Sequence, residues 1–126
     1  MMLKSRFFIP ALLCLALSSC ATNAEHKAAR EGELWTAAGE KVRSQCGSLI
    51  GKAQTAIEAD ACIAAIVRSD VLPYVHYPDL ALQLLEEQAA TSREYQAGKL
   101  DDVQAVAKAK YLQQQYEERV RARLGG

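Results

Sequence analysis

The chain has 126 residues, with 15 basic and 15 acidic side chains and a formal charge of zero. That length allows one small domain with a modest core. Without a basic excess the composition excludes the usual nucleic-acid binding surface, so no nucleic-acid partner is expected. Aromatic residues make up only 6% of the chain, and good helix formers such as alanine, leucine and glutamate are abundant. The composition favours an all-α domain.

The N-terminal segment has the plan of a secretory signal peptide. Lys4 and Arg6 come before an apolar run over residues 7–17, and the small residues Ser18 and Ser19 follow it. A helix that spans a bilayer needs about 20 apolar residues, so this run is too short to cross. The segment is therefore expected to direct export and not to span a membrane.

The sequence Leu17-Ser18-Ser19-Cys20 resembles the lipobox of bacterial lipoproteins. The resemblance implies that residues 1–19 are removed, that acyl chains such as palmitate are attached at Cys20, and that residues 20–22 form a lipidated tether. It implies a lipid-anchored protein of the cell envelope, and Ala21 in place of aspartate favours the outer membrane, facing the periplasm. An ordinary secretory signal with an incidental cysteine is the alternative.

Residues 23–126 are expected to form one helical domain. Thr22 and Glu25 have the spacing of a capping box, which predicts a first helix from about Asn23 to Gln45. Gly47 is a candidate left-handed cap at its end. Its apolar face repeats at helical spacing through Ala28, Trp35, Ala38, Val42 and Cys46.

Cys46 and Cys62 are the cysteines that remain after Cys14 and Cys20 are assigned to the N-terminal segment. In an oxidising compartment a disulfide is the simplest expectation, with two reduced thiols or a metal pair as alternatives. Zinc needs three or four ligands, and only two histidines could be added, so no metal site is expected. A straight helix would part these cysteines by about 24 Å, whereas a disulfide needs about 4.4 to 6.8 Å between Cα atoms. The chain is therefore predicted to reverse within residues 47–54.

Three further helices are predicted from capping and apolar spacing. A second capping box at Thr55 and Glu58 starts a helix that ends near Ser69, and Pro78 starts one that ends at Gln96. Asp101, with Gln104 three residues on, caps a last helix to about Leu124. The expected inward positions are Ile63, Ile66, Val67, Leu80, Leu84, Leu85, Ala89, Tyr95, Ala105, Ala109, Leu112, Tyr116, Val120 and Leu124. Short connections predict a small up-and-down bundle of three to four helices with one disulfide.

The segment 71–78 is the one cluster that looks unlike plain packing. Tyr74, His76 and Tyr77 lie between two prolines, which could hold them out to a ligand or partner. The other interpretation, which we favour, is a bend whose aromatic side chains cover the end of the bundle. Small-ligand binding by this segment remains the alternative function.

No pattern of catalytic residues is found along the chain. The serines lack a Gly-X-Ser-X-Gly setting, and no glycine-rich loop follows a strand, so neither an enzyme nor a cofactor is expected. The body, through Cys46, Cys62, Tyr77-Pro78-Asp79-Leu80 and Gly98-Lys99-Leu100-Asp101, resembles uncharacterised small helical lipoproteins of proteobacteria. The expected function is a helical envelope module, held to the membrane by its lipid, that is structural or binds an envelope protein.

Overall fold

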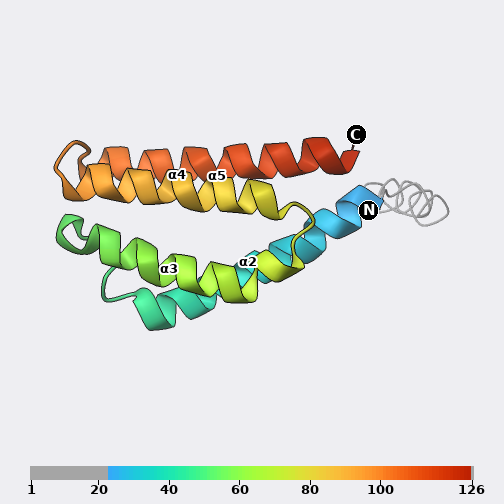
Figure 1. The fold of residues 1–126 in the computed structure, drawn as a ribbon, viewed down its shortest axis with the longest axis horizontal. Helices are drawn as coiled ribbons and strands as arrows, with labels where there is room; N and C mark the ends of the chain where they lie inside the picture. The colour runs from blue at the N-terminus through green and yellow to red at the C-terminus, as the bar shows by residue number, and fades with distance from the viewer. Residues whose placement is uncertain (1–22, 126) are drawn as a thin grey trace, which may run out of the picture.

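The computed structural model describes residues 23–125, which form four α-helices and two short 3-10 helices (Figure 1). The elements in chain order are α2 (Asn23–Cys46), η1 (Ala53–Thr55), α3 (Ala56–Asp70), η2 (Leu72–Tyr74), α4 (Pro78–Gln96) and α5 (Asp102–Gly125). Consecutive helices run in opposite directions, so the described part is the all-α, up-and-down bundle that the sequence predicts. The predicted signal peptide, Cys20 and the tether lie outside the described residues.

The hairpin between α4 and α5 forms as its local sequence predicts. Gly98 adopts a left-handed φ of 79° at the turn. The Gln104 N–H donates to Asp101 Oδ1 at 2.7 Å, and the Asp101 N–H donates to Gln104 Oε1 at 3.0 Å. The predicted capping box is therefore confirmed, and it starts α5 within one residue of the expected place.

The start of α3 is capped differently from the prediction. Thr55 makes no side-chain cap, because its hydroxyl donates to the Leu49 carbonyl at 2.7 Å. The first-turn N–H of Ile57 instead donates to Gln96 Oε1, at 2.9 Å, from the end of α4. The expected capping box with Glu58 is wrong, since a neighbouring helix supplies the acceptor.

The predicted disulfide joins Cys46 and Cys62, with 5.9 Å between their Cα atoms. The chain reverses between them, as expected, and the bridge ties the end of α2 to the middle of α3. The expected left-handed cap at Gly47 is wrong, because the left-handed residue is Gly51, with a φ of 85°. Gly47 fits for another reason: a Cβ there would lie 2.4 Å from the Arg43 carbonyl oxygen.

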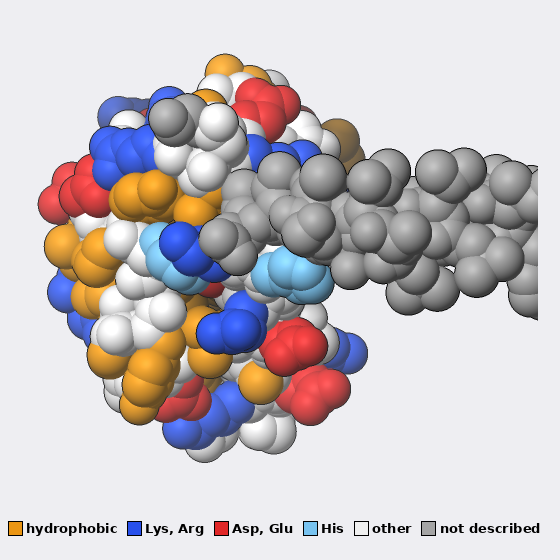
Figure 2. Space-filling model, turned by 90° about the vertical axis from the view of Figure 1, so that its right-hand side faces the viewer, with side chains coloured by type: hydrophobic (Ala, Val, Ile, Leu, Met, Phe, Trp, Pro, Cys, Tyr) orange, Lys and Arg blue, Asp and Glu red, His pale blue; other side chains and the backbone are white. Residues whose placement is uncertain are grey.

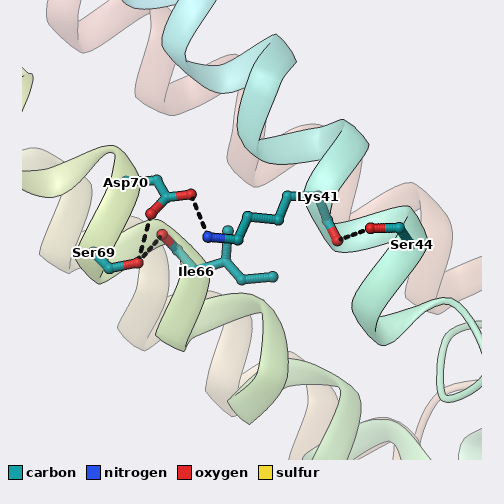
Figure 3. A network of polar contacts seen from close by, with 5 residues as sticks. All are labelled: Lys41, Ser44, Ile66, Ser69 and Asp70. Atoms are coloured by element: carbon teal, nitrogen blue, oxygen red, sulfur yellow. Dashed lines mark hydrogen bonds and ion pairs between the residues drawn. The ribbon is translucent and has the colours of Figure 1, made fainter.

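A polar network forms a second tie between α2 and α3 (Figure 3). Lys41 Nζ donates to Asp70 Oδ2 at 3.0 Å, and Ser69 Oγ donates to Asp70 Oδ1 at 2.7 Å. The hydrogen bonds from Ser69 and Lys41 lower the pKa of the Asp70 carboxyl. Together with the disulfide, this network fixes α2 against α3.

The core runs along the inner faces of all four described helices. Most predicted inward positions are buried or half-buried, although the side chain of Ala28 lies outside the described ones. Two positions depart from the expected pattern. Ala109, expected in the core, is exposed, and Glu31, on the inner face of α2, is buried with 4% of its surface exposed. Ala109 lines an apolar groove, and Glu31 holds the segment that contains His76.

Candidate functional site

The segment 71–78 closes the end of the bundle at which α2 begins (Figure 1). Figure 2 views this end, where histidine and charged side chains surround patches of hydrophobic ones. Tyr74 is 65% exposed. Tyr77 packs against the core, and the Arg123 guanidinium lies over its ring, 5.2 Å from the centroid. The structure thus brings the predicted site residues to one end, where Tyr74 and His76 line the same hollow and Tyr77 does not.

Glu31 pins this segment to α2. Its Oε1 accepts a hydrogen bond from the His76 backbone N–H at 2.6 Å and lies 2.7 Å from His76 Nδ1. The His76 side chain keeps 34% of its exposure, whereas that of Glu31 keeps 6%. The polar groups of His76 are therefore used to hold the bend, which favours the interpretation of these residues as a cover for the bundle end.

Sequence reasoning missed Glu31 as a functional position. The available signal was its spacing, four residues before Trp35 on the apolar stripe of α2. Trp35 packs edge-on against Tyr116, with ring centroids 5.4 Å apart and an interplanar angle of 70°. Burial, with the Glu31 carboxylate, raises the pKa of Tyr116 to about 12, so its hydroxyl stays protonated. The Glu31 carboxylate therefore has both the 71–78 segment and the buried hydroxyl of Tyr116 as neighbours.

We expect Glu31→Ala to lower the free energy of unfolding by about 1 to 3 kcal/mol, because the His76 N–H loses its acceptor. Glu31→Gln keeps an acceptor oxygen and should cost less. Urea denaturation followed by circular dichroism measures both. The matched control is Glu33→Ala, an exposed carboxylate on the same helix, which should stay within about 0.5 kcal/mol. Equal losses for Glu31→Ala and Glu33→Ala would contradict a pinning role.

An apolar groove of about 370 Å³ lies at the opposite end of the bundle. Its walls come from the first half of α3, the second half of α4, the start of α5 and the loop that follows Cys46. The apolar side chains that line it include Ile50, Ala59, Ile63, Ala105, Val106 and Ala109. Alanines line part of the groove, and the larger side chains of Ile50, Ile63 and Val106 line the rest.

The path of α2 explains why this groove exists. Trp35 of α2 packs on Tyr116 of α5. Beyond that contact α2 slants away from α5 (Figure 1). α2 therefore leaves one face of the first turns of α5 uncovered, and Val106 is 55% exposed. The apolar stripe of α5 predicts Ala109 in a core, and Ala109 is exposed because the helix that would cover it has diverged.

The groove also carries charged groups. Asp102 accepts a hydrogen bond from the Tyr95 hydroxyl. Asp60 forms no hydrogen bond or ion pair with any described residue, although the other α3 side chains that line the groove, Ala56, Ala59 and Ile63, are apolar. Burial raises the pKa of the Asp60 carboxyl, and the charge of Arg93 acts in the opposite direction. Asp60 is thus a half-buried carboxylate without a direct partner in the described part of the chain.

Comparison with known protein families, curated proteins and solved structures gave no match for this chain. No described helix has the length and apolar character needed to cross a bilayer. Within residues 23–125, no three histidine, cysteine, aspartate or glutamate side chains gather in a way that could hold a metal ion.

Proposed function

We propose that this protein is a lipid-anchored helical module of the cell envelope that binds a protein partner through its apolar groove. The observation that carries the proposal is the groove itself, with apolar side chains left uncovered where α2 diverges from α5. Exposed apolar surface of this kind is typical of interaction sites. Grooves between helices commonly bind the apolar face of an amphipathic helix.

The alternative is a small-ligand-binding lipoprotein that uses the 71–78 segment. A hollow of about 460 Å³ does lie beside Tyr74 and His76. Its support is weaker, because His76 is held by Glu31, and Tyr77 packs on the core and beneath Arg123. Only Tyr74 is left largely free to contact a ligand.

The position of the proposed anchor suits a partner in the periplasm. Cys20 comes three residues before the start of α2, and an extended chain of that length reaches about 11 Å. The groove lies at the other end of the bundle, and α5 has 24 residues, which span about 36 Å. A lipid at Cys20 would hold one end at the membrane and leave the groove at the end away from the anchor.

A photo-crosslinking amino acid placed at Val106 tests this proposal in cells. Val106, inside the groove, is 55% exposed, and Tyr111, outside it on the same helix, is 57% exposed. We expect one protein adduct at Val106 and none at Tyr111. Ala109→Leu, which fills the groove, should reduce the adduct about tenfold, the effect of about 1.4 kcal/mol. Ala107→Leu, on the exposed face of α5, is the matched control and should leave it unchanged.

The crosslinking result separates the two functions. An adduct at Val106 that survives Ala109→Leu would contradict binding in the groove. A crosslink to a small molecule from a probe at Tyr74, with none at Val106, would support the alternative function of the 71–78 segment. Tyr74 is 65% exposed, so the probe there is no less accessible than the one in the groove.

A further inference from the structure

We propose that the segment bound in the groove is an amphipathic helix of a partner protein that carries a lysine or arginine within its apolar face, opposite Asp60. This inference rests on the proposed function and adds the chemistry of the partner. It comes from the lining of the groove, the pairing of charges elsewhere in the bundle, and the size of the opening.

Four ion pairs between neighbouring helices lie at the edges of the bundle. Within the described residues, ion pairs join Lys41 to Asp70, Lys108 to Glu94, Arg119 to Glu87 and Arg123 to Asp79. Each of these carboxylates has a cation within 3.4 Å. Asp60 has no such contact among the described residues: it is half-buried in the groove wall, and Arg93 acts on its carboxyl through its charge without forming an ion pair.

A cationic group from a ligand would complete this site. Asp60 lies on the face of α3 that also presents Ala56, Ala59 and Ile63 to the groove, whereas the polar side chains Gln88, Thr91 and Ser92 line it from α4. The raised pKa that burial gives this carboxyl reflects a loss of hydration. A lysine or arginine brought against it would form a charge-assisted hydrogen bond in a partly desolvated place, where such bonds are strongest.

The charged side chains of the groove lining also favour a cationic group in the bound segment. Its acidic side chains are Asp60 and Asp102, and Lys52 is the basic side chain of the described lining. The Tyr95 hydroxyl donates to Oδ1 of Asp102, which is exposed, whereas Asp60 is half-buried and has no hydrogen-bond partner among the described residues. An occupant that matches this lining is apolar over most of its surface and positive at one point.

The dimensions suit a helix. The α5 positions that line the groove run from 102 to 109, a rise of about 10 Å, or two helical turns. Alanines at 56, 59, 105 and 109 line the groove, and their short side chains let another helix approach closely. A second helix can therefore pack there at the usual separation of about 8 to 10 Å between axes. Two turns present apolar side chains at i, i+3 or i+4, and i+7, with room for one basic residue among them.

Selection from a displayed peptide library tests the inference before any partner protein has been identified. The library holds amphipathic 14-residue peptides with fixed leucines on one face and one randomised position within that face. The full-length exported protein is the target, as wild type, Asp60→Asn, Glu58→Gln and Ala109→Leu. Glu58 is the matched control, since it is an exposed carboxylate on α3 outside the groove.

We expect lysine and arginine to be enriched about tenfold at the randomised position with wild type and with Glu58→Gln. This enrichment should vanish with Asp60→Asn, and Ala109→Leu should reduce the recovery of all groove-binding peptides about tenfold. A tenfold effect corresponds to about 1.4 kcal/mol. Circular dichroism of Asp60→Asn checks that the variant is folded, which we expect because it removes a carboxylate that burial disfavours.

Other outcomes would overturn the inference in distinguishable ways. Groove-dependent peptides without a basic preference would refute the role of Asp60 and leave the proposed function standing. Absence of any peptide whose recovery falls with Ala109→Leu would count against both. Binding of dodecylammonium without any peptide would make the occupant a small cationic amphiphile. Dimerisation in sedimentation experiments that Ala109→Leu abolishes would make it a second copy of this chain.

Discussion

Replacing Cys62 with alanine is expected to lower the free energy of unfolding by about 2 to 5 kcal/mol, the usual cost of losing a native bridge in a small secreted domain. The bridge joins residues 16 positions apart, and closing a loop of this size contributes about 3 kcal/mol. Cys46→Ala should cost more, because Cys46 is fully buried and its removal also leaves a cavity. Guanidinium denaturation without reductant measures both variants.

Reduction of the wild type provides the control. Dithiothreitol should reproduce most of the loss seen for Cys62→Ala, and it should have no further effect on either variant. The double variant should lie within about 0.5 kcal/mol of Cys46→Ala, since both lack the same bond and Cys62 is only partly buried. Two thiols that alkylate in the folded, exported protein would contradict the bridge.

The bridge also bears on the groove. It closes the loop that follows Cys46, and that loop supplies Leu49, Ile50 and Lys52 to the groove wall. The Thr55 hydroxyl and the Leu49 carbonyl hold the same loop from within. Loss of the bridge therefore acts on stability and on the shape of the binding surface together.

The helices were predictable because their signals are local. Pro78 fixes the first turn of α4, and Asp101 with Gln104 fixes that of α5. The details that failed depend on contacts far along the chain. Gln96 caps the first turn of α3 from 39 residues away. The left-handed φ falls at Gly51, whereas Gly47 lies against the Arg43 carbonyl, and the local sequence does not distinguish these two roles.

The groove was not predictable from the sequence for a related reason. Helical spacing gives the direction in which Ala109 points, but not whether another helix lies there. That depends on the crossing of α2 with α5, which the packing of Trp35 on Tyr116 and the Cys46–Cys62 bridge set together. Glu31 is similar, since its partner His76 lies 45 residues away.

We expect Cys20→Ala to abolish acylation. The reason is the resemblance of Leu17-Ser18-Ser19-Cys20 to a lipobox, in which the cysteine sulfur is the acceptor of the acyl chains. Because the resemblance implies cleavage directly before the acylated cysteine, Cys20→Ala should also keep residues 1–19 and accumulate as the longer precursor. Metabolic labelling with an alkyne analogue of palmitate, followed by intact-mass measurement, tests both effects.

Cys14→Ala is the matched control, because Cys14 lies in the segment expected to be removed before the mature protein forms. It should leave the labelling unchanged. Equal labelling of Cys20→Ala and the wild type would remove the lipoprotein interpretation.

The crosslink at Val106 tests whether the lipid anchor is needed for partner binding. If the adduct persists when an ordinary cleavable secretory signal replaces residues 1–20, the lipid serves to retain the module, and if it disappears, the partner must lie close enough to the membrane for the anchor to present the groove to it.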